Sequence, residues 1–248
     1  FYYVASDMKL NDDGWARGED NERIYVYLFF KTFLVSGIIT ALCLLLAFPV
    51  AHLLATLPMA KSSLLMILVL LPFWTSLLVR TTSWIALLQE QGIVNDLLVG
   101  LGLIGADGRL SMMYNMTGTI VAMTHVLLPF MILPLYASLE KIDFRLTEAA
   151  GDLYATPIAG FWRVIFPLSL PGVFAGSLLV FIPAAGDFIN ARFLGSPQTS
   201  MIGSVVQDQF LVQLDYPSAA ALSLILMAII TVAVLIYSKL FGTEGLAA

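Results

Sequence analysis

The sequence has few charged residues for its length. Of its 248 residues, 12% are charged and 59% are apolar. A soluble domain carries about 25% charged residues, so this chain has too few to cover a surface that faces water. The mean hydropathy of +0.90 also indicates a surface that is largely apolar. Lipid is therefore expected to cover much of the protein.

Cysteine and basic charge are scarce as well. The single cysteine, Cys43, lies in an apolar stretch, so the fold cannot depend on an internal disulfide bond. The net charge is −5, whereas domains that bind nucleic acid are usually strongly basic. We therefore expect no nucleic-acid partner.

The sequence also lacks the short motifs of common enzymes. It has no G-x-x-x-x-G-K-[ST] phosphate-binding loop, no H-E-x-x-H and no C-x-x-C. His52 and His125 lie in different apolar stretches, which favours packing or hydrogen bonding over metal binding. We therefore expect no catalytic residue, metal site or cofactor in this chain. If ATP drives its function, a separate subunit binds the ATP and magnesium.

Two other classes of membrane protein share features with this sequence. Ala185-Gly186-Asp187 resembles the Gly-Asp pair of membrane aspartyl proteases, but Ala184 replaces the preceding glycine of that pattern. No second aspartate lies well within an apolar stretch to complete a catalytic pair. A secondary transporter or channel, which needs no ATPase, is the stronger alternative.

Five stretches have the length and composition of membrane-spanning helices, which need about 20 largely apolar residues. They cover residues 33–54, 64–79 with a continuation to 88, 117–139, 168–186 and 217–238. The prediction is an all-α polytopic membrane helix bundle, a single domain over residues 1–248. Residues 93–104 are apolar but short, and predict a helix lying at the membrane interface.

The loops differ in the density of their basic residues. One set of short loops and flanks carries Lys61, Lys141, Arg145, Arg163 and Lys239. Because loops rich in lysine and arginine tend to stay in the cytoplasm, this side is predicted to be cytoplasmic. The polar residues 1–27 then form an external segment. Its acidic excess is typical of a solvated loop, or of a surface that docks a partner.

The segment from 140 to 171, EKIDFRLTEAAGDLYATPIAGFWRVIFPLSLP, is long for a plain connection. Residues 144–155 have helical composition. Thr156 and Pro157 fit the cap and first position of a second short helix, which is expected to end near Phe166 because Pro167 follows. The small residues beside Glu148 would let the first helix enter a partner's groove, with Glu148 making charged hydrogen bonds. A self-packed amphipathic loop is the alternative.

This segment resembles the EAA loop of ABC-importer permeases, whose pattern is E-A-A, three residues, G, nine residues, I-x-L-P. Glu148, Ala149 and Ala150 match the start and Pro167 matches the end, with Val164 and Phe166 in place of Ile and Leu. The resemblance implies that this loop couples the chain to an ATPase, through Glu148, Ala149, Ala150, Gly151, Val164 and Pro167. Tyr154 departs from the pattern, because the family usually has glycine there to ease the turn. Thr156-Pro157 is the alternative place for that turn.

The resemblance covers residues 24–237, with segments 70–84, 125–143 and 167–188 similar to permeases of the spermidine/putrescine branch. It implies the type I ABC importer permease fold, a MetI-like transmembrane domain with about six spans, so one N-terminal helix would be missing from this chain. It places the protein in the bacterial cytoplasmic membrane, with residues 140–170 inside. The implied partners are a second permease, as a heterodimer, two cytoplasmic ATPase subunits and an external solute-binding protein.

Ionisable residues in or near the spans are candidates for the solute path, because a charge in lipid is costly. Asp187 follows the small residues that end the fourth stretch, while Arg80 and Glu90 lie at and beyond the end of the second. Trp74 and Trp84 offer aromatic faces to a cation, or form an aromatic belt. Asp187 paired with Arg192 or Arg80 is the purely structural alternative. The branch resemblance implies a polyamine as substrate, with another small organic solute or ion as the alternative.

Overall fold

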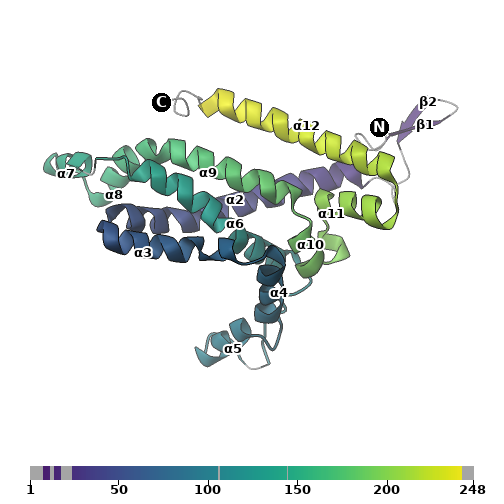
Figure 1. The fold of residues 1–248 in the computed structure, drawn as a ribbon, viewed down its shortest axis with the longest axis horizontal. Coiled ribbons are helices and arrows are strands. Elements are labelled where there is room, and N and C mark those ends of the chain that lie inside the picture. The colour runs from purple at the N-terminus through teal and green to yellow at the C-terminus, as the bar shows by residue number, and fades with distance from the viewer. Residues whose placement is uncertain (1–7, 12–13, 18–23, 106, 144, 242–248) are drawn as a thin grey trace. The chain divides into compact units, whose positions relative to one another are not determined.

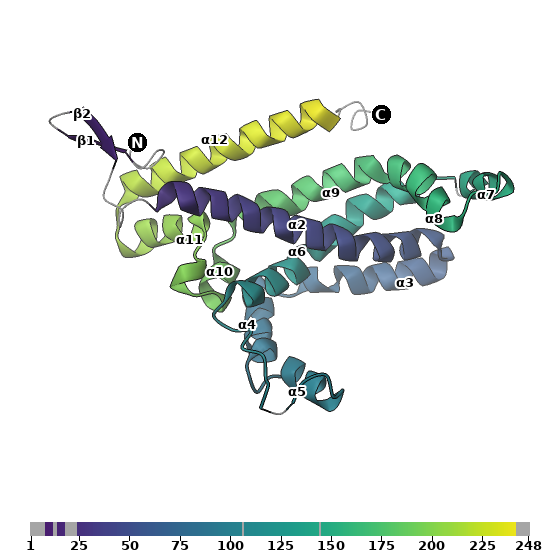
Figure 2. The ribbon, with the colours of Figure 1, turned by 180° about the vertical axis from the view of Figure 1, so that it is seen from behind.

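The computed structural model describes residues 8–11, 14–17, 24–105, 107–143 and 145–241. Helices make up most of these ranges (Figures 1 and 2), which confirms the all-α expectation for the apolar part of the chain. In chain order the helical elements are α2 Tyr25–Thr56, α3 Met59–Leu70, η1 Leu71–Trp74, α4 Leu77–Leu88, α5 Ile93–Gly100, α6 Met116–Leu139, α7 Arg145–Asp152, α8 Pro157–Gly160, η2 Phe161–Ile165, α9 Phe166–Gly186, α10 Ile189–Leu194, η3 Pro197–Thr199, α11 Ile202–Gln207, η4 Asp208–Val212 and α12 Tyr216–Phe241.

Four helical stretches among the described residues are long and apolar enough to cross a membrane. They are α2, α6, the continuous run Pro157–Gly186 and Tyr216–Lys239. A fifth is added if a bent pair of helices, Met59–Trp74 and Leu77–Gly100, counts as one span. The number agrees with the five predicted stretches. Lipid offers no hydrogen bonds to the backbone, so these apolar runs must satisfy their own amides as helices.

The second predicted span is not the straight helix that the sequence suggested. The helices on either side of Thr75-Ser76 are bent by 97°, so the predicted stretch from 64 to 88 is two helices with a break between them. Pro72 lacks the amide that would bond to the Leu68 carbonyl, and the chain tightens there into the 3₁₀ turn η1. Ser76 is then extended, with φ −61° and ψ 145°, and α4 starts afresh.

The chain divides into two compact units. Most of the boundaries between them fall within a long helix, and one directly follows η1. The first unit comprises 1–39, 75–123 and 182–235, and the second comprises 40–74, 124–181 and 236–248. In the first unit, Tyr25, Leu28 and Phe29 of α2 pack with Ile202 of α11 and Leu222 of α12. A separate cluster there joins Leu88, Ala122 and Leu194.

The second unit is built on faces of residues spaced four apart. On α2 these are Cys43, Ala47 and Ala51, and on α6 they are Met131, Leu135 and Leu139, all fully buried. A spacing of four places residues one above another on a single side of a helix. Each helix therefore turns one stripe inward and leaves the rest of its apolar surface outward.

Helices α6 and α9 approach each other closely through two glycines, Gly172 and Gly176. A β carbon at Gly172 would lie 2.5 Å from Ser138 Cβ and 2.7 Å from the Pro134 carbonyl oxygen. A β carbon at Gly176 would lie 2.7 Å from Met131 Sδ. Small residues at four-residue spacing allow such close backbone approach between helices in membranes.

A short hairpin in the N-terminal segment was not predicted. Strands β1 Met8–Asn11 and β2 Gly14–Arg17 pair antiparallel, with Lys9 opposite Ala16 and Leu10 opposite Trp15. The sequence analysis expected a polar loop over residues 1–27. The acidic residues Asp7, Asp12, Asp13, Glu19, Asp20 and Glu22 lie outside the described residues.

Candidate functional site

The helix–turn–helix predicted between the third and fourth spans is present. Helix α7 covers Arg145–Asp152, and α8 begins at Pro157 after Thr156. The Thr156 hydroxyl oxygen accepts a hydrogen bond from the Ala159 amide at 3.3 Å, so Thr156 is the N-cap that the sequence indicated. Residue 144, the predicted start of the first helix, lies outside the described residues.

The turn after α7 is left-handed at Tyr154, where φ is +61°. The Tyr154 amide donates to the Gly151 carbonyl at 2.9 Å, and the Ala155 amide donates to the Ala150 carbonyl at 3.0 Å. These two bonds form the Schellman motif that usually ends with glycine at the left-handed position. The chain thus keeps that geometry with a tyrosine, and Thr156 caps the helix that follows.

Tyr154→Gly is expected to stabilise the turn by about 1 kcal/mol, because glycine removes the clash of a β carbon in the left-handed region. Tyr154 is 98% exposed, so little packing within the chain is lost. The measurement is thermal unfolding of the purified protein in detergent. Tyr154→Ala is the control, since it removes the ring but keeps the β carbon. Equal stability of the two variants would show that the backbone is not strained.

Pro167 does not end the second short helix, and that prediction was wrong. Helix α8 passes through the π-helical turn η2 into α9, giving one run from Pro157 to Gly186. In η2 the Phe166 amide donates to the Phe161 carbonyl, five residues back. The widened turn lies directly before Pro167, where an ordinary helix would set the proline ring against the Arg163 carbonyl. The loop is therefore continuous with the fourth span.

An aromatic cluster attaches this continuous helix to α2. The ring of Phe48, on α2, lies 5.2 Å from Phe161 edge to face and 6.2 Å from Phe166. Trp162 lies 5.4 Å from Phe161 and 5.0 Å from Phe166. Such ring pairs each contribute about 0.5–1.5 kcal/mol beyond their buried area. The cluster therefore packs η2 against α2.

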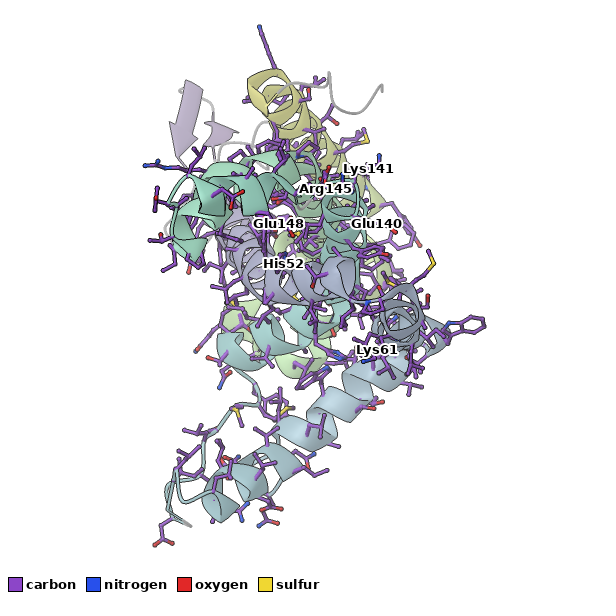
Figure 3. All side chains as sticks on the ribbon, turned by 90° about the vertical axis from the view of Figure 1, so that its left-hand side faces the viewer. His52, Lys61, Glu140, Lys141, Arg145 and Glu148 are labelled. Atoms are coloured by element: carbon purple, nitrogen blue, oxygen red, sulfur yellow. The ribbon has the colours of Figure 1, made fainter. Side chains whose placement is uncertain are left out.

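A groove of about 450 Å³ lies between the end of α2 and the α7–α8 turn. His52 and Thr56 line it from α2, and Glu148 and Ala150 line it from α7. Figure 3 shows His52 and Glu148 close together in the view toward this end, with Lys61, Glu140, Lys141 and Arg145 around them. Glu148 thus stands at the mouth of a groove with charges of both signs nearby.

The outer surface of the turn is apolar and uncovered within this chain. Leu153 is 82% exposed, Tyr154 98% and Ile158 73%. Of the residues predicted to couple, Glu148, Ala149, Gly151 and Pro167 are exposed, whereas Ala150 and Val164 are partly buried. A carboxylate beside exposed apolar side chains is suited to docking another protein.

Asp187 lies one residue beyond the end of α9 and is held by Asn190. Its carboxylate accepts hydrogen bonds from the Asn190 backbone amide at 3.2 Å and from Asn190 Nδ2 at 2.6 Å. Burial raises the pKa of Asp187, while the bonds from Asn190 lower it. Asn190 was not among the residues predicted from the sequence. It lies three residues after Asp187, a spacing at which an aspartate side chain can accept a hydrogen bond from a backbone amide, although the N-cap of α10 is Phe188.

The alternative in which Asp187 pairs with Arg192 is not what the structure shows. Arg192 Nη1 instead donates to both carboxylate oxygens of Asp208, at 3.0 and 3.1 Å. The Nε atom of Arg80 is enclosed by protein and has no hydrogen-bond partner among the described residues. Arg80 precedes Thr81, whose hydroxyl group donates to Asn190 Oδ1 at 2.9 Å.

The remaining path candidates are placed by contacts with other parts of the chain, or are exposed. Trp84 packs against the cluster of Leu88, Ala122 and Leu194. Trp74 is 90% exposed and belongs to the second unit. The Glu90 carbonyl accepts a hydrogen bond from Arg109 Nη1 at 2.8 Å. Within the described ranges, no three His, Cys, Asp or Glu residues are placed to hold a metal ion.

Comparison with other proteins found relatives along nearly the whole chain. The chain is 37% identical over 216 residues to the spermidine/putrescine transport system permease protein PotB of Haemophilus influenzae, covering 87% of this chain and 75% of the relative. It is 38% identical over 214 residues to PotB of Escherichia coli, covering 86% and 77%. No model of a protein family matches the chain.

The fold is similar to that of solved transporters. A chain of a bacterial ABC transporter that imports the acidic polysaccharide alginate matches with a TM-score of 0.70 and 17% identity, over 88% of this chain and 79% of that one. The same kind of transporter, solved in complex with a periplasmic protein carrying an alginate pentasaccharide, matches with a TM-score of 0.67 and 17% identity, over 88% and 78%.

Proposed function

This chain belongs to the permease family of the spermidine/putrescine transport systems, and we propose that it carries a polyamine across a bacterial cytoplasmic membrane as one subunit of an ABC importer. The observation that carries the proposal is the 37–38% identity to PotB permeases over 86–87% of the chain. The apolar helices and the similarity to an importer fold support it.

The proposed assembly has four further kinds of contact. A second permease completes the path as a heterodimer, two cytoplasmic ATPase subunits bind the loop at 140–170, an external binding protein delivers the solute, and lipid surrounds the spans. The sequence has no phosphate-binding loop of its own. ATP and magnesium therefore belong to the ATPase subunits, and this chain supplies path and coupling without a catalytic step.

Coupling is proposed to run from Glu148 through the turn into the bundle. Closure of the ATPases on ATP moves α7, with Ala149, Ala150 and Gly151 seated in the ATPase and Glu148 anchoring the helix. Val164 and Pro167 lie in the run that joins α8 to α9, which carries the motion into the fourth span. The contact between Phe48 and Phe161 at 5.2 Å supports a second route, into α2.

Asp187 is proposed to face the solute on its way through the membrane, near the outer end of the path. A polyamine carries several ammonium groups, and each favours a carboxylate or an aromatic face. Burial of Asp187 strengthens its attraction for a cation because the local dielectric is low. Arg80, Trp74, Trp84 and Glu90 are proposed as further lining residues.

Asp187→Asn is expected to lower the efficiency of putrescine and spermidine uptake by roughly 10- to 100-fold, since a hydrogen bond to a charged group contributes about 1.5–3 kcal/mol. Uptake of labelled amine is measured in vesicles that hold the complete complex. Asp107→Asn, at an exposed position, is the matched control. If the parent complex takes up neither amine, a polyamine is excluded as the substrate. Equal uptake by Asp187→Asn would remove Asp187 from the path.

The same vesicles separate the importer from the alternative, a secondary transporter or channel. An importer takes up solute only with the ATPase subunits present and ATP supplied to their side. Uptake by this chain and its partner permease alone, driven by an ion gradient, would establish the alternative.

A further inference from the structure

Asn190 joins Asp187 to helix α4 through an enclosed chain of hydrogen bonds. The side chain of Asn190 donates through Nδ2 to Asp187 Oδ2 at 2.6 Å. Its Oδ1 atom accepts from the Thr81 hydroxyl at 2.9 Å. Asn190 and Thr81 are each 1% exposed. The carboxylate at the end of α9 is thus connected to the helix that follows the bend in the second span.

The Asp187 carboxylate fixes the orientation of the Asn190 amide, because a carboxylate only accepts hydrogen bonds and must therefore meet Nδ2. This orientation leaves Oδ1 facing Thr81. The Thr81 hydroxyl oxygen lies 2.9 Å from Asn190 Oδ1 and 3.0 Å from the Leu77 carbonyl oxygen, so its proton serves either acceptor. Without the hydroxyl group, the buried Oδ1 would lose this donor, and the amide that binds Asp187 would be held less firmly.

We propose that Asn190, supported by Thr81, is a positioning residue that holds the Asp187 carboxylate ionised and correctly directed for a cationic solute. This proposal rests on the proposed function of Asp187 in the solute path. Asn190 itself acts through Asp187, and its side-chain amide bonds to both Asp187 and Thr81. The class of ligand concerned is an organic cation with ammonium groups.

Two arginines lie on the helices that carry this set of hydrogen bonds. Arg80 lies on α4 beside Thr81, and Arg192 on α10 is engaged by Asp208 of η4 at 3.0 Å. Burial raises the pKa of Asp187, and the Asn190 side-chain bond is the first of the causes that lower it. Removing that bond raises the pKa further, so the carboxyl group stays protonated up to a higher pH. A protonated Asp187 has lost its attraction for an ammonium group.

The test compares Thr81→Val and Asn190→Leu with Thr82→Val. Thr82 lies next to Thr81, is exposed, and donates only to the carbonyls of Leu78 and Val79 on its own helix, at 2.9 and 3.0 Å. We expect KM for putrescine to rise roughly three- to tenfold in Thr81→Val and further in Asn190→Leu, with little change in maximal rate. The acid limb of the uptake profile should move to higher pH in both, and Thr82→Val should match the parent.

A second measurement does not depend on transport. An apolar carbodiimide reacts with protonated carboxyl groups. The complex is treated intact, and mass spectrometry of peptides from the treated chain gives the modified fraction of Asp187 at each pH. The midpoint should lie at higher pH in Thr81→Val than in Thr82→Val. Equal midpoints and equal KM in these two variants would overturn the proposal while leaving the importer function intact. If the midpoint moves but putrescine neither protects Asp187 nor is taken up, the proposed substrate path fails and the positioning contact stands.

Discussion

Glu148→Lys is expected to abolish ATP-driven uptake while the chain still inserts into the membrane. The substitution replaces a carboxylate with a cation at the mouth of the groove between α2 and α7, where Lys141 and Arg145 already lie at the same end of the molecule. It removes the charged hydrogen bonds proposed to anchor the ATPase, each contributing about 1.5–3 kcal/mol. Uptake in vesicles and co-purification of the ATPase subunits are the two measurements.

Glu140→Lys is the matched control for this experiment. It makes the same charge reversal at the same end of the chain, at an exposed residue just after α6. A second variant, Ala150→Trp, fills the groove without changing charge, and is expected to reduce uptake at least tenfold through poorer docking. Normal uptake and normal ATPase retention in both Glu148→Lys and Ala150→Trp would contradict the coupling role.

Gly172→Ala is expected to destabilise the protein by roughly 1–3 kcal/mol, the usual cost of overfilling a packed contact. The added methyl group would lie 2.7 Å from the Pro134 carbonyl oxygen and 2.5 Å from Ser138 Cβ. A backbone carbonyl cannot move aside without displacing α6. Gly172→Leu should prevent the close approach of α6 and α9 altogether, and yield little folded protein.

The control for the glycine experiment is Gly37→Ala in α2. A β carbon at Gly37 meets nothing within 4 Å, and alanine favours a helix over glycine by up to about 1 kcal/mol. Thermal unfolding in detergent should therefore show opposite signs for the two substitutions. A Gly172→Ala variant as stable as Gly37→Ala would mean that the helices separate freely at this contact.

Hydropathy alone located the four long helices, because an apolar run of about 20 residues in lipid must form a helix to pair its own backbone amides and carbonyls. It did not reveal the bend of 97° after Trp74. The residues after that bend are more polar than those before it, but leucine, valine and isoleucine side chains continue to Leu88, and Pro72 is the one residue of this stretch that lacks a backbone amide. A proline alone does not predict whether a helix will kink, break or continue.

In the loop at 140–171, one local sequence pattern predicted the structure correctly and another did not. Thr156 and Pro157 specify their cap by their own side-chain chemistry, so the sequence was sufficient there. The sequence predicts that the helix ends at Pro167, because proline disrupts an ordinary helix, but the π turn at Phe161–Ile165 relieves the clash. That turn is stabilised by Phe48 from a distant part of the chain, which no local pattern contains.

The solute-path residues were partly predictable. A carboxylate at the end of an apolar span identified Asp187, since such charges are costly. Asn190 and Thr81 are ordinary polar residues in the sequence, and only the fold brings α4 beside α10 to connect them. Trp84 met the criterion for an aromatic lining residue, yet it packs against a hydrophobic cluster.

The π turn between Phe161 and Ile165 also fixes how many residues this stretch must contain. A π turn holds one residue more than an ordinary helical turn. Deleting a single residue here would restore an ordinary turn, in which the ring of Pro167 meets the carbonyl group four residues before it. Insertions and deletions in this segment should therefore be far rarer among working relatives than substitutions that preserve its length.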